Sequence, residues 1–305
     1  MRPIISPREL AIAIGLSESS LKRWADDGII QVTRTAGGHR RIAIGEAIRF
    51  VRSIGAPLLR PDILGLRDLP IADDAAQLAA TPPGELLLAA LKRGDARAAR
   101  GIVLSLYLAG QSVAAIADGP IRDAMAQVGD LWRHDPANVY VEHRATDICL
   151  QAVQQLRQLV EPAQTHGTAI GAAPPGDPYL LPSLLAATAL AAESWNTTNL
   201  GPDMPFRALV AAVGRHRPAL VWLSVSSMQD GAEMSDGLAG LLDASTDEGP
   251  TILVGGRAAA ELELPKSPRV QRGATLAELV AMAQALRERN EAAAPGFPPA
   301  PDPDR

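Results

Sequence analysis

The spacing of apolar residues changes twice along the chain. Up to about residue 54, short apolar stripes at helical spacing precede a strand-like run and a glycine turn. Residues 84–163 carry apolar stripes at three- and four-residue steps, which predicts a four-helix bundle. Residues 164–290 alternate apolar β-type runs with helical runs, which predicts a five-stranded parallel α/β sheet with helices on both faces. We therefore expect a multidomain chain.

Two segments of different composition separate or follow these parts. Residues 55–83 are richer in Pro, Gly and Asp than their flanks and are expected to be a linker. Residues 291–305 are Pro-rich and are expected to be a disordered tail. The predicted domains are therefore 1–54, 84–163 and 164–290.

The first two predicted helices have clear ends. Ser6 is a candidate N-cap with Glu9 completing a capping box, and Gly15 ends the first helix. Ser17 can cap a second helix that runs to about Asp27. Two short helices joined by a three-residue turn form a helix-turn-helix unit.

A short hairpin is predicted after the second helix. Strand-like residues Ile29–Val32 lead into a turn at Gly37 and Gly38, and His39–Ile42 return as a second strand. This pattern makes the unit a winged helix-turn-helix with a cationic wing. The candidate DNA-contacting residues lie on the second helix and the wing: Ser19, Ser20, Lys22, Arg23, Arg34, Gly38, His39, Arg40 and Arg41.

Charge is distributed unevenly along the chain, whose formal net charge is -5. The first 60 residues hold ten Lys and Arg against five Asp and Glu, so the remainder is strongly acidic. We call the basic N-terminal part the head and the acidic remainder the body. This charge distribution favours binding of a polyanion by the head alone, and we expect the partner to be a double-stranded DNA operator. Because one short head gives few base contacts, we also expect a homo-oligomer, a dimer or tetramer.

The cysteine count and the hydropathy of the chain limit which classes of protein and of metal site are possible. The single Cys149 excludes an internal disulfide and a cysteine-based zinc site, and its apolar helical surroundings predict a buried thiol. No run of 18 apolar residues is present, and charged residues occupy the position of a signal-peptide core. We expect a cytoplasmic protein that is not an enzyme and has no membrane partner.

The head carries a family resemblance. Leu21–Trp24, Gly28–Ile30 and Thr35–Arg41 resemble the DNA-binding head of MerR-type transcription regulators, over nearly all of residues 1–54. The resemblance implies that the second helix enters the major groove and that Arg40 and Arg41 lie near the DNA backbone. A solvated charged turn is the alternative interpretation of these two arginines. Trp24 is expected in the core rather than stacked on a base.

The helical region carries a second resemblance. Trp132 falls at the end of one predicted helix, and Glu142 and His143 fall early in the next, so the three can converge at one end of the bundle. This arrangement resembles the helical cap of cobalamin-dependent photoreceptor regulators of the CarH type. It implies that Trp132 covers the upper face of the corrin, with Glu142 and His143 nearby. The alternative is a core Trp132 beside a solvated Glu-His pair.

The rim of the predicted sheet resembles the flavodoxin-like cobalamin-binding domain of methionine synthase, methylmalonyl-CoA mutase and the same photoreceptor regulators. Ligands of such sheets bind at the carboxyl ends of the strands. Three segments there resemble the family's strand exit, hydroxyl-bearing loop and glycine pair around the nucleotide tail: Leu200–Gly201, Leu223–Ser226 and Val254–Gly256. The resemblance makes these residues candidate cofactor contacts: Asp177, Tyr179, Ser224, Ser226, Gly255 and Gly256.

Two positions depart from the family signature Asp-x-His-x-x-Gly, because Tyr179 replaces the His and Pro182 replaces the Gly. Here the residues are Asp177-Pro178-Tyr179-Leu180-Leu181-Pro182, so Tyr179 stands where the family has its lower cobalt ligand. A phenol is a poor substitute for this ligand, because it must first lose a proton with a pKa of about 10. Three interpretations stay open: a lost cofactor, adenosylcobalamin bound without a protein lower ligand, or another ligand. We predict no metal site.

Together these patterns predict a DNA-binding transcription regulator, a repressor, with a sensory or oligomerisation module that resembles a cobalamin-binding photoreceptor. The alternatives are a corrinoid carrier related to methyltransferases, and an adaptor or antirepressor that acts through protein contacts.

Overall fold

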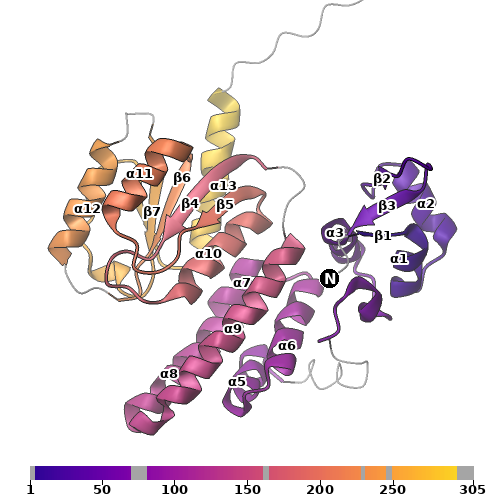
Figure 1. The fold of residues 1–305 in the computed structure, drawn as a ribbon, viewed down its shortest axis with the longest axis horizontal. Coiled ribbons are helices and arrows are strands. Elements are labelled where there is room, and N and C mark those ends of the chain that lie inside the picture. Colours follow the sequence, from indigo (N-terminus) through magenta and orange to yellow (C-terminus); the bar gives the residue numbers. More distant parts are fainter. Residues whose placement is uncertain (1–3, 70–80, 161–164, 228–230, 245–248, 294–305) are drawn as a thin grey trace, which may run out of the picture.

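The structure is a computed structural model, which describes residues 4–69, 81–160, 165–227, 231–244 and 249–293. Three parts follow one another along the chain: an N-terminal head, a group of helices and a C-terminal α/β part (Figure 1). The predicted tail falls outside the described residues, apart from its first three positions, which belong to a helix.

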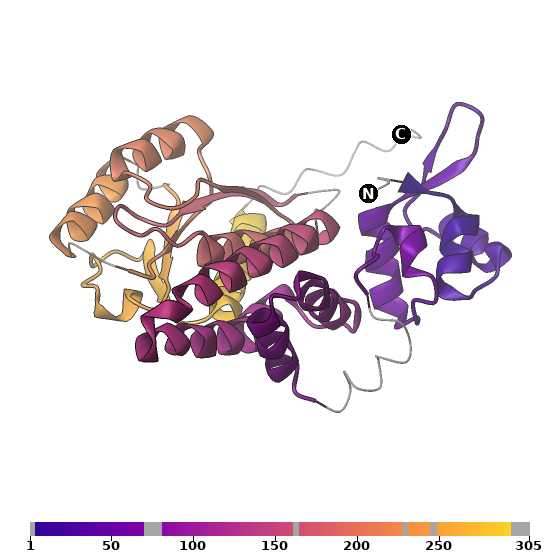
Figure 2. The ribbon, with the colours of Figure 1, turned by 60° about the horizontal axis from the view of Figure 1, so that its bottom comes forward.

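The head combines short helices with a small sheet. Its elements are β1 (Ile4–Ile5), α1 (Pro7–Ile14), α2 (Glu18–Asp26), β2 (Thr33–Arg34), β3 (Arg40–Ala43) and α3 (Ile44–Ile54). The strands pair antiparallel in the order β1-β3-β2, and the β2–β3 hairpin extends beyond the rest of the head (Figure 2). The capping box of Ser6 and Glu9 and the left-handed Gly15 are present as predicted, and Ser17 caps α2.

The hairpin begins later than the sequence predicted. Ile29–Val32 do not form a strand, because the carbonyl of Trp24 at the end of α2 accepts the N–H groups of Ile29 and Ile30. The N–H of Gln31 donates to Glu46 of α3. These backbone groups are therefore unavailable for a ladder, and pairing starts at Thr33. Helix α3 and strand β1 were not predicted.

The helical part confirms the predicted bundle. It contains α5 (Pro83–Arg93), α6 (Ala96–Leu108), α7 (Val113–Ile116), α8 (Arg122–His134) and α9 (Val139–Val160). A π-helical turn at Ala117–Ile121, which contains Pro120, joins α7 to α8, so these two form one bent member of the bundle. In the segment expected to be a linker, Leu64 and Leu66 are fully buried, so its first half is packed.

The C-terminal part confirms the predicted parallel sheet. Its strands are β4 (Gly167–Ala172), β5 (Trp195–Asn199), β6 (Leu220–Ser224), β7 (Thr251–Gly255) and β8 (Val270–Gly273), in the order β5-β4-β6-β7-β8. Helices α10 (Leu180–Ala192) and α13 (Leu276–Ala293) pack on one face. Helices α11 (Phe206–His216) and α12 (Gly231–Asp243) pack on the other.

Helix α10 joins the helical part to the sheet. Its Leu181, Leu184 and Leu185 belong to the same apolar cluster as buried residues of α6 and α9, whereas Ala186 and Leu190 face the sheet. Figure 1 shows α10 lying between the sheet and α9. Among the described residues, no helix has both the length and the apolar character that a membrane span requires.

Candidate functional site

The strand order places a switch point between β4 and β6. The chain leaves β4 toward β5 on one side and returns to β6 on the other, and ligands of open α/β sheets bind in the crevice outside such a point. The loop after β4 carries Asp177, and the loop after β6 carries Ser226 and Ser227. These two loops define the candidate site.

Asp177 ties the two loops together. Its side chain is fully buried, and its Oδ2 accepts the backbone N–H groups of Ser226 at 2.5 Å and Ser227 at 3.1 Å. Its Oδ1 accepts the N–H of Tyr179 at 3.0 Å. Three backbone donors supply the hydrogen bonds that a buried carboxylate requires. Both carboxylate oxygens are therefore engaged by the chain's own backbone.

Tyr179 lies at the surface of this rim. Its side chain is 40% exposed, and the guanidinium carbon of Arg257 lies 5.6 Å from the centre of its ring. Arg257 in turn donates to the carbonyl of Ser226. Among the described residues, no group of three or more His, Cys, Asp or Glu side chains is placed to hold a metal ion. The contact seen for Tyr179 is thus with the guanidinium of Arg257.

The predicted glycine pair lies beside the same loops. Gly255 ends β7, and its carbonyl accepts the N–H of Val225 at 2.7 Å. Gly256 has a φ of +108°, and a Cβ there would lie 2.4 Å from the carbonyl oxygen of Val225. The close approach that requires this glycine is therefore to protein backbone. Ser224, which ends β6, is 7% exposed.

A chain of hydrogen bonds closes the sheet beneath α10. The indole Nε1 of Trp222, on β6, donates to the hydroxyl of Ser183 at 3.1 Å, and this hydroxyl donates to the amide oxygen of Asn199 at 2.9 Å. The same amide oxygen accepts the N–H of Gly201 at 3.1 Å. Ser183 is fully buried and Trp222 is 1% exposed. Two strands, β5 and β6, and the helix α10 are thus connected by side chains.

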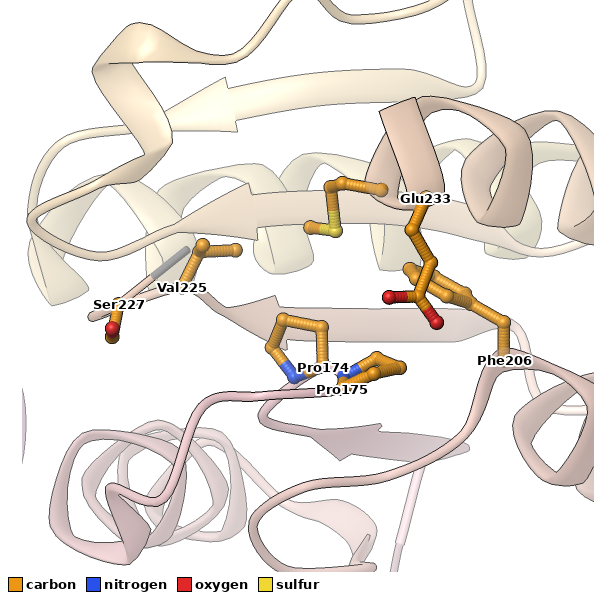
Figure 3. A pocket seen from close by; sticks show the side chains of 7 residues that line it. Pro174, Pro175, Phe206, Val225, Ser227 and Glu233 are labelled. Carbon is orange, nitrogen blue, oxygen red and sulfur yellow. The ribbon is translucent and has the colours of Figure 1, made fainter. Parts of the chain in front are cut away.

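A shallow hollow lies beside the switch point, on the face covered by α11 and α12. Its cavity volume is about 10 Å³, between Pro174 and Pro175 of the β4 loop and Val225 and Ser227 of the β6 loop. Figure 3 shows the carboxylate of Glu233 directed toward the two prolines. Pockets for drug-sized ligands have volumes of about 300–1,000 Å³. This hollow is smaller than that range.

Comparison with known proteins finds similarity to corrinoid proteins. Residues 84–157 match the B12 binding domain. The monomethylamine corrinoid protein of Methanosarcina barkeri superposes with a TM-score of 0.52 at 16% identity, over 66% of this chain and 96% of that one. The body has the fold of a corrinoid protein. At this identity the likeness establishes the fold alone.

Two further structures are similar at lower scores. A cobalamin-binding protein from Desulfitobacterium hafniense DCB-2 gives a TM-score of 0.34 at 17% identity, over 68% of this chain and 99% of that one. The methanol:cobalamin methyltransferase complex MtaBC from Methanosarcina barkeri gives 0.35 at 16%, over 90% and 93%. No curated protein sequence matches the chain.

The residues of the rim do not fit the lower half of a corrinoid. Both oxygens of Asp177 are bonded to backbone, so neither orients an imidazole, and no imidazole stands at position 179. The indole of Trp222 fills the space beside β4 at the switch point. We therefore assign no cobalt chemistry to these residues.

The predicted cap residues lie on α8 and α9. Glu142 and His143 are in the first turns of α9, with 3.6 Å between a carboxylate oxygen and the imidazole Nε2. Glu142 also accepts from the hydroxyl of Thr146, and the His143 side chain is 75% exposed. The described polar partners of this pair therefore lie on α9 itself. Trp132 lies in α8, and its side chain is outside the described set.

The predicted DNA-contacting residues fall on two neighbouring elements of the head. Ser19, Lys22 and Arg23 are exposed on one side of α2, where Lys22 pairs with Glu18 at 2.8 Å. Ser20 is half-buried, and its hydroxyl is 2.8 Å from that of Ser17. The hairpin carries the remaining candidates: Arg34, Gly38, His39, Arg40 and Arg41.

Arg40 connects the hairpin to α2. Its guanidinium forms an ion pair with Asp26 in the last turn of α2, and its side chain is only 19% exposed. Arg40 therefore braces the hairpin against α2. The ring of Trp24, also on α2, is half-buried and lies 5.3 Å from the ring of Phe50, as expected for a core residue.

Sequence reasoning missed the residues that close the rim. Ser183, Asn199 and Trp222 are 16 to 39 residues apart and carry no recognisable motif. Their proximity follows from strand register, which pairs Gly171 with Trp222. The one available signal was Gly171 inside a strand, since such a glycine often marks a close approach by another group.

Proposed function

We propose that residues 4–54 bind duplex DNA and that the chain is a MerR-type transcription regulator, a repressor rather than an enzyme. The observation that carries this proposal is the ion pair between Arg40 and Asp26, which fixes the cationic hairpin to the end of α2. The exposed basic side of α2 and the hairpin thereby form one unit. A short, N-capped, basic helix beside a wing is the arrangement that enters a major groove.

The body would serve this head as a sensory or oligomerisation module. One head of this size offers few base contacts, so specific recognition requires two heads on a two-fold site. The corrinoid-protein fold supplies a large rigid support for such pairing. The acidic composition of the body keeps it away from the duplex.

DNA binding is tested by footprinting the intact protein on its own upstream region and by gel shifts at fixed salt. We expect Arg23→Ala with Arg41→Ala to abolish the specific footprint and to reduce the slope of log affinity against log salt by up to about 0.9 per lost phosphate contact. Arg60→Ala is the matched control, because Arg60 is an exposed cation paired with Asp62 outside this unit. An unchanged affinity and slope in the double variant would refute the proposal.

Corrinoid binding is the second candidate, and the comparisons taken alone favour it over DNA binding. Its support is the match of residues 84–157 to the B12 binding domain together with the corrinoid-protein fold. The protein would then be a carrier related to methyltransferase corrinoid proteins. Purification in the dark with adenosylcobalamin distinguishes the two candidates. A stoichiometric corrin absorbance that comigrates with the protein supports corrinoid binding, and a footprint without it supports a corrinoid-independent regulator.

A further inference from the structure

We infer that the switch-point crevice between β4 and β6 is filled by the chain's own side chains, so that the α/β part is a closed scaffold that admits no ligand tail there. This inference concerns the sheet and does not depend on DNA binding by the head. Two independent sets of contacts support it, one on the loops and one inside the sheet.

The first set joins the loops that an inserted ligand would have to separate. Asp177 reaches from the β4 loop to the backbone of Ser226 and Ser227, 49 and 50 residues later in the chain. On the other side of Ser226, Arg257 donates to its carbonyl. The β6 loop is therefore held from both neighbouring strands. No water or ligand is needed to satisfy the buried carboxylate, because three backbone donors already do so.

The second set fills the space beneath the loops. Gly171 of β4 is paired in register with Trp222 of β6, and a Cβ at Gly171 would lie 2.0 Å from the indole ring. The ring therefore occupies the position that a side chain on β4 would take, at the centre of the sheet. Its N–H is bonded to the fully buried Ser183 of α10, which fixes the orientation of the ring.

These contacts define which ligands are excluded. A planar heterocycle of about the size of indole, such as the base of a corrinoid nucleotide tail, would compete with Trp222 for the same space. Entry would also break the hydrogen bonds of Asp177 and leave a buried carboxylate without partners. A corrinoid held only by surfaces outside the crevice would not meet either obstacle.

The direct test compares hydroxocobalamin, which carries the nucleotide tail, with diaquocobinamide, which lacks it. Each is titrated into the full-length protein and followed by corrin absorbance and by calorimetry. We expect either no binding of both, or binding of both with affinities within a few-fold, because the tail finds no site. Binding of hydroxocobalamin at least tenfold tighter than that of cobinamide would overturn the inference.

Two variants test the contacts themselves. Trp222→Ala should lower the Tm, and added indole should raise it again, because the removed ring leaves a cavity of its own shape. A Tm equal to that of the parent protein would contradict the inference that the Trp222 ring fills the crevice between β4 and β6. For the loops, Asp177→Asn should lower the urea midpoint more than the control Asp203→Asn, whose carboxylate accepts the N–H of Gly176 within the described part of the β4 loop. Equal midpoints for the two variants would contradict the tie between the loops.

Discussion

Cys149 shows how burial controls chemistry at a single residue. It lies in α9 with its side chain buried, and burial raises the pKa of its thiol to about 12. The thiolate is the reactive form, so a raised pKa suppresses reaction with electrophiles near neutral pH. The structure therefore confirms the buried thiol predicted from sequence.

Thiol labelling checks this interpretation. At pH 8 we expect iodoacetamide to leave Cys149 unmodified in the folded protein and to alkylate it in denaturant, as mass spectrometry would show. Because the thiol of the unfolded chain ionises first, the free energy of unfolding should fall as pH rises from about 9 toward about 12. Rapid labelling of the native protein would contradict the burial.

Gly94 illustrates a backbone requirement. It follows the last residue of α5 with a φ of +75°, and the guanidinium of Arg144 lies 2.8 Å from where a Cβ would be. Arg144 donates from this position to the carbonyl of Lys92 in the last turn of α5. The glycine thus provides both the left-handed conformation and room for the arginine.

Substitution of this glycine should be costly. We expect Gly94→Ala to lower the free energy of unfolding by about 1–2 kcal/mol, from the left-handed conformation and displacement of Arg144. Urea denaturation measures the change. Gly110→Ala is the control, because Gly110 also has a positive φ but its Cβ would meet no atom within 4 Å, so it should lose less.

At the scale of elements, the head is attached to the body through the end of α6. Arg52 of α3 donates to the carbonyls of Tyr107, Gly110 and Gln111, and its guanidinium carbon lies 3.6 Å from the centre of the Tyr107 ring. The carbonyl of Tyr107 lies in the last turn of α6, where it also accepts the N–H of Gly110, and the other two carbonyls follow the end of this helix. A cation at this position interacts favourably with the helix dipole. Arg52 thus adds a polar connection between two parts of the chain that also share an apolar cluster.

Loss of this arginine should loosen the attachment while leaving each part folded. We expect Arg52→Ala to increase the radius of gyration in X-ray scattering and to speed proteolysis within residues 55–83. The control is Arg49→Ala on the same helix, because Arg49 pairs with Glu46 and the carbonyl of Ile29 inside the head. Equal proteolysis rates for both variants would exclude a role of Arg52 in attachment.

At the scale of the whole molecule, long-range side-chain contacts join the helical part to the α/β part. Asp118, in the π-helical turn, accepts the N–H groups of Leu276 and Ala277 at the start of α13, at 3.0 and 2.9 Å. Arg157 of α9 donates to the carbonyl and hydroxyl of Thr197 on β5. The π turn thus places a carboxylate where it caps a helix 158 residues away.

Removing this cap should weaken the joint. We expect Asp118→Ala to lower the free energy of unfolding by about 1 kcal/mol, as for other lost N-caps. Hydrogen exchange should show faster exchange at the first turn of α13 than in the parent protein. Asp123→Ala, in the first turn of α8, is the control and should leave α13 unchanged.

Short-range patterns in the sequence determined the order and type of most elements. Capping residues lie within three positions of the groups they satisfy, as with Ser6 and Glu9, so helix ends can be recognised locally. The alternation of apolar runs predicted the parallel sheet. The sequence alone also showed that position 179 carries a tyrosine and not a histidine. Helix α3 was also within reach, since Ile44, Ile48 and Val51 form a buried stripe at helical spacing.

Only the tertiary structure decided which side chains meet at the rim of the sheet and between the parts of the chain. Asp177 meets the β6 loop, Trp222 covers Gly171, and Asp118 caps α13 because strand order and register bring them together. Partners that lie from 49 to 159 residues apart leave no local signal, since each depends on how the whole chain packs. The sequence therefore determined which groups are available, and the fold decided that those at the rim bind one another.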